Sequence, residues 1–234
     1  MIPIGDDRRL PIVPFVVYLL IALNVYVFVQ EIRAPDIDRF IDLFATIPYD
    51  ITHGIVLPSP SPPLPALTIV TAMFLHAGLL HIAFNMLFLF VFGPVIEYAC
   101  GHVRFAVLYL LCGIAGGIAQ VTVAPNSHVP ELGASGAIAG ILGAYIVTYP
   151  AARINTIVPI GCFPLFLRLP AAIVIGIWAL IQFTNGFGSL SARLEADAGG
   201  TAYFAHIGGF SFGVLAIALF RRRDAGTPRS RGYT

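Results

Sequence analysis

The chain has 234 residues, of which 58% are hydrophobic and only 11% are charged, and its mean hydropathy is +0.87. A soluble domain of this length cannot hide so much apolar surface, so the composition predicts a polytopic membrane protein in contact with the lipid bilayer. The formal net charge of +1 supplies no field that would attract nucleic acid. Cys100, Cys112 and Cys162 lack the paired C-x-x-C spacing of zinc or redox sites and are interpreted as packing residues.

Six apolar segments predict an all-α bundle of six transmembrane helices. The spans are expected at residues 12–30, 79–98, 105–123, 133–149, 170–187 and 202–220. The first segment is too long for the apolar region of a signal peptide and lacks a cleavage site, so we count it as a retained span. The chain then divides into a short N-terminus (1–11), a membrane domain (12–220) and a basic tail (221–234) that is expected to be disordered.

The arginines predict an orientation, because cytoplasmic segments carry an excess of positive charge. Arg33, Arg39 and Arg193 fall on one side of the predicted membrane. The other side carries the larger set: Arg8, Arg9, Arg104, Arg153, Arg168 and Arg221 to Arg223. Both termini are therefore expected in the cytoplasm. The short N-terminus, which has no transit-like segment, favours a prokaryotic plasma membrane.

Two connections have a distinct character. The loop 31–67 begins with apolar residues at helical spacing behind a suitable N-cap, Asp36, and its second half is rich in Ser and Pro and is expected to be extended. The apolar residues are Ile37, Phe40, Ile41 and Phe44. Two interpretations stay open for this helix: a packed turn of a surface loop, or an interfacial helix that affects substrate access. The connection 151–169 is apolar but too interrupted, by Pro159, Gly161 and Pro164, to be another span.

The fourth span opens with a serine between glycines, which has two interpretations. Small residues four apart, Gly136 and Gly140, are a common packing motif of membrane helices. Alternatively, Ser135 is a nucleophile, and the glycines let other backbones come close to it. This segment taken alone favours packing.

Two further spans open with polar residues, which are costly in hydrocarbon and therefore candidates for a functional site. His81 and Asn85 lie one turn apart on one face of the second span. In the sixth span His206 shares a face with two glycines, so another helix can approach closely on the side of the histidine. The glycines expected to pack the helices at the site are Gly133, Gly136, Gly140, Gly209 and Gly213.

The predicted topology places these polar residues at one depth. The second, fourth and sixth spans run in the same direction, and each carries its polar residues in its first turns. Ser135 and His206 can then approach to hydrogen-bond distance, as a nucleophile and its general base require. His81 and Asn85, together with the Ser135 backbone N–H, can donate to the oxyanion of an acyl-transfer intermediate, where one donor contributes about 3 kcal/mol.

Other chemistries are disfavoured by what the sequence lacks. No histidine is followed by glutamate, as the H-E-x-x-H zinc motif requires, and the predicted spans contain no aspartate for an aspartyl protease. The carboxylate at a span end, Glu97, is expected near the cytoplasmic surface rather than at the midplane, where ion-coupled transporters hold theirs. A metal site made by His76, His81 and His206 stays a minor alternative, and no metal or cofactor is expected.

The motifs HxxxN at His81 to Asn85, GxSG at Gly133 to Gly136 and HxxGxxxG at His206 to Gly213 resemble those of the rhomboid intramembrane serine proteases. The resemblance covers about residues 12–220 and implies a rhomboid-like six-helix bundle. It also implies site roles, with Ser135 as nucleophile, His206 as base, and His81 and Asn85 as oxyanion-hole donors. His76 falls where the family often carries a histidine ahead of the second helix.

The chain departs from the family pattern in two places. Some members carry an aromatic residue four positions after the serine, which stacks on the catalytic histidine. Here that position is Ala139, so His206 would have to be oriented by other packing. The tryptophan–arginine pair of some first loops is also missing, since the sole tryptophan is Trp178. Both departures bear on substrate access and on the shape of the site.

The sequence therefore predicts a serine endopeptidase that cuts transmembrane protein substrates near the outer membrane face by a Ser135–His206 dyad. By resemblance, its substrates are helices with small and helix-breaking residues near the cut. The alternative is a non-catalytic relative that holds transmembrane helices in the same groove. The remaining polar residues of the spans are interpreted as interface or structural residues: Asn24, Gln120, Gln182 and Asn185. Substrate identity, oligomeric state and regulation stay open.

Overall fold

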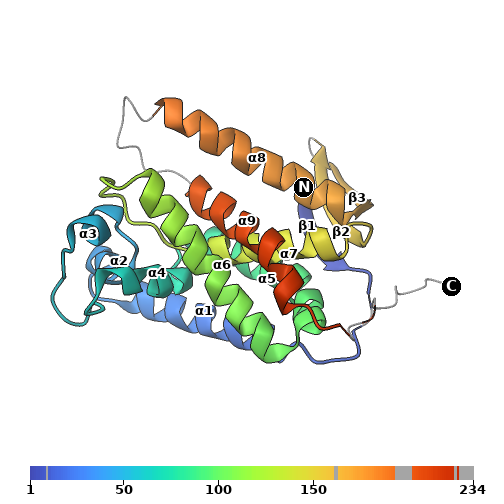
Figure 1. The fold of residues 1–234 in the computed structure, drawn as a ribbon, viewed down its shortest axis with the longest axis horizontal. Helices are drawn as coiled ribbons and strands as arrows, with labels where there is room; N and C mark the ends of the chain where they lie inside the picture. The colour runs from blue at the N-terminus through green and yellow to red at the C-terminus, as the bar shows by residue number, and fades with distance from the viewer. Residues whose placement is uncertain (9, 161–162, 193–201, 224–225, 227–234) are drawn as a thin grey trace.

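The computed structural model describes residues 1–8, 10–160, 163–192, 202–223 and 226, and Figure 1 shows the order of their elements. The helices are α1 (Phe15–Arg33), α2 (Ile37–Phe44), α3 (Pro48–His53), α4 (Thr68–Thr71), α5 (Leu79–Cys100), α6 (His102–Val123), α7 (Ser135–Thr148), α8 (Ala171–Ala192) and α9 (Tyr203–Phe220). The 3-10 turns η1 (Pro65–Leu67) and η2 (Ala72–Phe74) flank α4. The strands are β1 (Ile2–Asp6), β2 (Arg153–Ile160) and β3 (Phe163–Pro170). The expectations for Arg9, Cys162, Arg193 and most of the tail concern residues outside this description.

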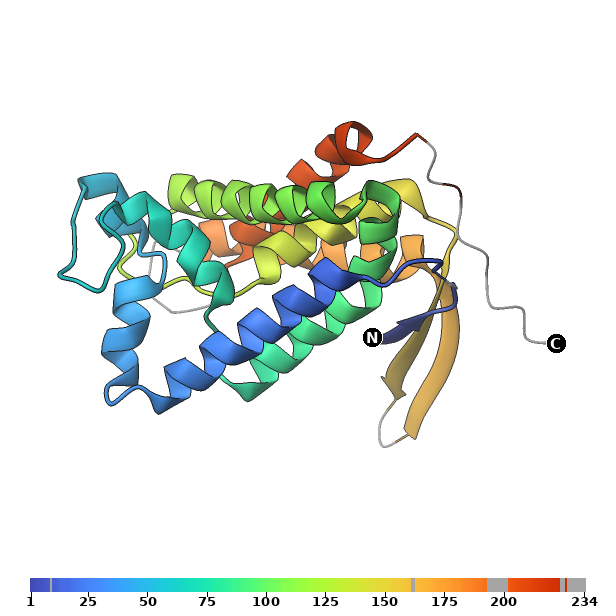
Figure 2. The same cartoon turned by 90° about the horizontal axis from the view of Figure 1, so that it is seen from below.

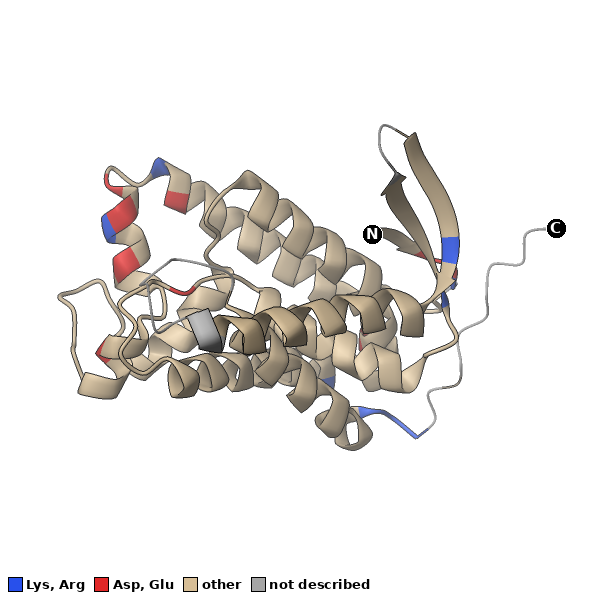
Figure 3. Ribbon diagram, turned by 90° about the horizontal axis from the view of Figure 1, so that it is seen from above, with Lys and Arg blue, Asp and Glu red and all other residues tan. Residues whose placement is uncertain are grey.

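Five helices among the described residues are long and apolar enough to cross a membrane: α1, α5, α6, α8 and α9. Figure 3 shows most of the charged residues at the two ends of the bundle, with the long helices between them. The segment predicted as a fourth span forms α7, which has 14 residues. At 1.5 Å per residue α7 is about 21 Å long, shorter than a hydrocarbon core of about 30 Å. The expected six spans therefore become five helices of spanning length and one shorter helix.

Helix α7 packs against α5, α6, α8 and α9, and every residue from Gly136 to Tyr145 is buried. A helix that is apolar on all sides suits this enclosed position. The segment before α7 is tied to its neighbours by backbone hydrogen bonds. The Gly133 N–H donates to the Ala72 carbonyl at 2.8 Å, and Glu131 and Thr46 exchange bonds of 2.8 and 2.9 Å. These bonds fix where α7 begins.

The predicted helix after Asp36 is present as α2. The Asp36 side chain accepts a hydrogen bond of 2.9 Å from the Arg39 backbone N–H, as expected of an N-cap. Leu43 is the residue of α2 that is buried, while Phe40 and Phe44 contact each other with ring centroids 5.1 Å apart. The same loop also contains α3, which begins at Pro48 and was not predicted.

A small antiparallel sheet contradicts the expected all-α fold. Strands β2 and β3 form a hairpin, and β1 pairs with β2, so the strand order is β1-β2-β3. The hairpin occupies the connection 151–169, which was expected not to be another span. Pro159 and Pro164 lie opposite each other near the end of the ladder, where a missing N–H costs little. Figure 2 shows the sheet projecting from the end of the bundle that carries the N-terminus, called the sheet end below.

The N-terminal segment is joined to α7 by a buried polar cluster. Arg8 pairs with Asp6 at 3.1 Å and donates to the hydroxyl of Tyr145, which in turn donates to Asp6. The Arg8 guanidinium also lies 4.1 Å from the ring centroid of Tyr149. Tyr145 is fully buried in the last turns of α7. The cluster therefore joins the N-terminal segment to the helix that begins at Ser135.

We predict that Tyr145→Phe lowers the free energy of unfolding by about 1–3 kcal/mol, because the substitution leaves buried Asp6 and Arg8 each without one hydrogen bond. Unfolding of the detergent-solubilised protein measures this loss. Tyr26→Phe is the matched control, because Tyr26 is 62% exposed on α1 and should tolerate the change. An equal effect in the two variants would contradict the role given to the cluster.

Candidate active site

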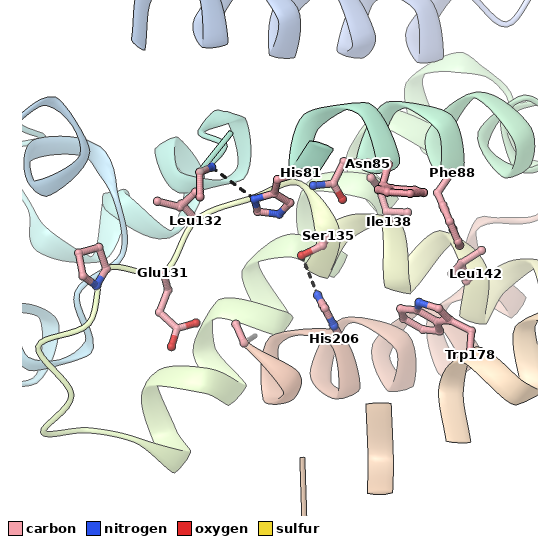
Figure 4. Close-up of a pocket in the computed structure, with 14 residues that line it drawn as sticks. His81, Asn85, Phe88, Glu131, Leu132, Ser135, Ile138, Leu142, Trp178 and His206 are labelled. Atoms are coloured by element: carbon pink, nitrogen blue, oxygen red, sulfur yellow. Dashed lines mark hydrogen bonds between the residues drawn. The ribbon is translucent and has the colours of Figure 1, made fainter. Parts of the chain in front are cut away.

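Ser135 and His206 lie in direct contact. Ser135 is the first residue of α7 and His206 lies in the first turn of α9, and the Ser135 Oγ is 2.7 Å from the His206 Nε2. Figure 4 shows this pair with His81 and Asn85 on the opposite side of the serine from His206. The structure therefore brings together the four polar residues that the sequence placed at one depth.

The close approach of α7 and α9 depends on glycine. A Cβ atom at Gly209 would overlap the Gly136 carbonyl oxygen, and one at Gly213 would overlap the carbonyl oxygen of Gly140. Both contacts are to backbone atoms, which cannot move aside without moving the helix. The two interpretations of the fourth span are therefore compatible, because the glycine contacts that pack α7 on α9 also set the distance between Ser135 and His206.

Gly133 shapes the other wall of the site. Its backbone φ of +126° lies in a region that residues with a side chain rarely adopt. A Cβ atom at this position would also lie 2.9 Å from both Cε1 and Nε2 of His81. The segment before Ser135 can thus run directly against the His81 ring because residue 133 has no side chain.

His81 and Asn85 on α5 present donors to the site. The Nδ1 of His81 accepts a hydrogen bond of 3.3 Å from the Ala77 backbone N–H. An accepting Nδ1 leaves the proton of the neutral ring on Nε2, the atom that faces Gly133. Asn85 is 7% exposed, and its Nδ2 has no hydrogen-bond partner within the described part of the chain. Two donors therefore point at the space beside Ser135.

His76 packs behind His81. It is fully buried, its ring meets the His81 ring edge-on with centroids 5.1 Å apart, and its backbone N–H donates to the Glu31 carboxylate at 3.0 Å. Burial, reinforced by the neighbouring His81, lowers the pKa of His76 to about 4, so its ring is neutral near pH 7. His76 thus supports the His81 ring, and His81 lies between His76 and Ser135.

Sequence reasoning missed the partners of His206 on α8. The Nδ1 of His206 lies 2.7 Å from the Oε1 of Gln182, and the Trp178 ring lies 5.8 Å from the imidazole between centroids. These two contacts replace the aromatic stacking that Ala139 cannot provide. The one signal available was the spacing of Trp178 and Gln182, which places them on one helix face.

Gln120 on α6 joins the segments that carry the pair. Its Oε1 accepts from the backbone N–H groups of Phe204 and Ala205, at 3.1 and 3.3 Å, in the first turn of α9. Its Nε2 donates to the Glu131 carboxylate at 2.7 Å, four residues before Ser135. The structural role expected for Gln120 is thus the capping of α9.

A cavity of about 470 Å³ opens beside Ser135 and His206. Most of its wall is apolar and comes from α5, α7 and α8: Phe84, Phe88, Ile138, Leu142 and Trp178. Figure 4 shows Phe88, Leu142 and Trp178 beyond the polar residues, on the side away from Glu131. Within the described ranges no group of three or more His, Cys, Asp or Glu side chains is arranged to hold a metal ion. The site places a serine hydroxyl, an imidazole and two hydrogen-bond donors next to an apolar space.

The apolar helices define an integral multi-pass membrane protein, and comparison with known proteins gives its family. Residues 65–223 match the family model described as a rhomboid domain, and the chain belongs to the rhomboid family. Rhomboid protease GluP of Bacillus subtilis is 34% identical over 158 residues, 68% of this chain and 27% of GluP. Rhomboid protein 1, mitochondrial, of Saccharomyces cerevisiae is 28% identical over 203 residues, 85% of this chain and 51% of the yeast protein. Inactive rhomboid protein 1 of Drosophila melanogaster is 33% identical over 78 residues, 33% of this chain and 5% of the fly protein.

The chain therefore aligns with about a quarter of GluP and about half of the yeast protein. The relatives include proteins named as proteases and one named as inactive. Family membership consequently leaves the activity of this chain to be argued from its own residues.

We predict that Gly213→Ala forces α9 away from α7, lowers the free energy of unfolding by about 1–3 kcal/mol and abolishes the contact between Ser135 and His206. Gly176→Ala on α8 is the control, because nothing lies within 4 Å of a Cβ there. In a helix this control substitution should be neutral or stabilising, by up to about 1 kcal/mol. Unfolding in detergent compares the two, and equal stabilities would refute the glycine contact.

Proposed function

We propose that this protein is an intramembrane serine endopeptidase that cuts transmembrane protein substrates near the outer membrane face. The observation that carries the proposal is the 2.7 Å separation of the Ser135 Oγ from the His206 Nε2 beside a cavity. The relatives named as rhomboid proteases add support. In this proposal both termini and the sheet end face the cytoplasm, and the membrane is a prokaryotic plasma membrane.

The proposed reaction proceeds through an acyl-enzyme. His206 accepts the Ser135 proton on Nε2 while Oγ bonds to the scissile carbonyl carbon, and the carbonyl oxygen becomes an oxyanion. The donors for this oxyanion are the Ser135 backbone N–H, the His81 Nε2–H and the Asn85 amide. Breaking of the C–N bond releases the amine, which takes its proton from His206. A water molecule then loses a proton to His206 and attacks the ester carbon, and His206 returns that proton to the Ser135 Oγ as the carboxylic acid leaves.

The cavity indicates what kind of segment can react. Its apolar wall, which includes Phe84 and Leu142, suits the side chains of a membrane segment rather than a charged peptide. A regular helix shields its carbonyl carbons, so the reacting segment has to be extended at the cut. Small and helix-breaking residues make that local unwinding cheaper. Transmembrane substrates with such residues near the outer face fit both conditions.

A non-catalytic protein that binds transmembrane helices is the second candidate. One relative is named as an inactive rhomboid protein, so the fold occurs without activity. A binder has no need for an aligned serine and histidine, whereas this chain keeps both within hydrogen-bond distance. We therefore rank proteolysis first.

We predict that the native chain in proteoliposomes cleaves a model transmembrane substrate, and that Ser135→Ala and His206→Ala each reduce the rate by more than about 10³-fold. Ser211→Ala is the matched control, because Ser211 lies exposed on α9, and it should cleave at the native rate. Gel analysis with mass spectrometry of the products measures the rates. Cleavage by Ser135→Ala at the native rate would disprove the assignment of the nucleophile.

We also predict that Asn85→Leu, which keeps the size of the side chain but removes the donor, lowers kcat by about 10²- to 10³-fold and leaves KM nearly unchanged. The substitution affects kcat more than KM because the donor stabilises the oxyanion of the transition state more than it stabilises the carbonyl of the bound substrate. Asn126→Leu in the exposed loop before α7 is the control. A rise in KM at constant kcat would assign Asn85 to substrate binding instead.

A further inference from the structure

The dyad has a third partner on α8. The amide oxygen of Gln182 lies 2.7 Å from the His206 Nδ1, and the other ring nitrogen of His206 lies 2.7 Å from the Ser135 Oγ. A carbonyl oxygen can only accept a hydrogen bond, so the Nδ1 must carry the proton. The Nε2 of the neutral ring is then left with its lone pair toward Ser135.

This tautomer is the one that a general base needs. With the proton on Nε2 instead, the ring would donate to Ser135 and could not take its proton. Trp178, one turn before Gln182, contacts the same imidazole, so α8 limits both the tilt of the ring and its tautomer. Within the described residues no carboxylate forms an ion pair with His206.

We propose that Gln182 is the positioning residue of the dyad, which holds His206 in the tautomer that accepts the Ser135 proton. This inference rests on the proposed function for its catalytic consequence, but its structural content is independent of it. When Ser135 loses its proton to Nε2, the Nδ1 proton stays in place and donates to Gln182 more strongly, because the ring is now positively charged. A neutral amide performs this task without a buried carboxylate, which is costly in a membrane protein.

The location of Gln182 adds a consequence for access. Trp178 of the same helix lines the cavity together with Phe84 and Phe88 of α5. The residue that orients the base therefore belongs to a helix that also bounds the space for substrate. The base is held in its reactive tautomer while α8 stays packed on α9.

Three variants test the proposal through kinetics. Gln182→Met keeps the length of the side chain without the acceptor, and it should lower kcat by about 10- to 100-fold at nearly constant KM, less than the loss of the whole base. Gln182→Glu restores an acceptor and should recover activity to within about tenfold of the native rate. Asn185→Leu, an exposed amide on the same helix, should leave the native rate unchanged.

A second readout needs no activity. In protein labelled with ¹⁵N-histidine, the His206 signals are assigned by their loss in His206→Ala, and their shifts report which ring nitrogen carries the proton. Native protein and Gln182→Glu should have the Nδ1–H form, whereas Gln182→Met should have a mixture of tautomers. If Gln182→Met does not fold, Gln182→Leu takes its place.

The outcomes separate the two proposals. A native Nδ1–H signal that is lost in Gln182→Met supports the positioning role even if no substrate is cut, in which case the proposed function alone fails. Cleavage by Gln182→Met at the native rate, or a tautomer that is the same in Gln182→Met and native protein, would overturn the role of Gln182.

Discussion

The site depends on the backbone contact between α7 and α9. Lipid supplies no hydrophobic force that would drive two apolar helices together, so close packing of small residues has to hold them. Gly209 and Gly213 lie directly against the carbonyl oxygens of Gly136 and Gly140, and the helices cannot approach this closely with any other residue there. The hydrogen bond between Ser135 and its partner histidine lies at the end of this contact. Changes in packing up to about two turns from the serine therefore act on the distance between Ser135 and His206.

Buried polar groups fix the helix ends around this contact. Glu97 accepts hydrogen bonds of 2.9 Å from the backbone N–H groups of Val16 and Val17, where the positive end of α1 needs an acceptor. Gln120 does the same for α9, and Tyr145 joins α7 to the N-terminal strand. Because an unpaired polar group in an apolar interior is costly, each of these bonds fixes one register of its helix. Part of the rigidity around Ser135 and His206 thus comes from residues that do not contact either of them.

The sequence located the long apolar helices and the contact between Ser135 and His206, because both leave periodic signals. Apolar length located the spans, and the pairing of His206 with glycines identified the face that meets Ser135. The sheet was missed because Pro159 and Pro164 were interpreted as interrupting regular structure. Their pairing across two strands cannot be recognised from the local sequence. The contact of Gln182 with His206 was missed for a similar reason, since it depends on where α8 packs rather than on local pattern. The length of α7 was overestimated because hydropathy cannot distinguish a helix enclosed by protein from one that faces lipid.

The most direct test of the account is to label the membrane-reconstituted protein with a fluorophosphonate probe. The adduct is then mapped by mass spectrometry of the peptides of the labelled protein. The probe reports an activated serine without requiring the right substrate. We expect one adduct, on the peptide that contains Ser135, with strongly reduced labelling in His206→Ala and none in Ser135→Ala. An unlabelled native protein that still binds transmembrane peptides, or an adduct on another serine, would contradict the claim that Ser135 and His206 form a working nucleophile and base.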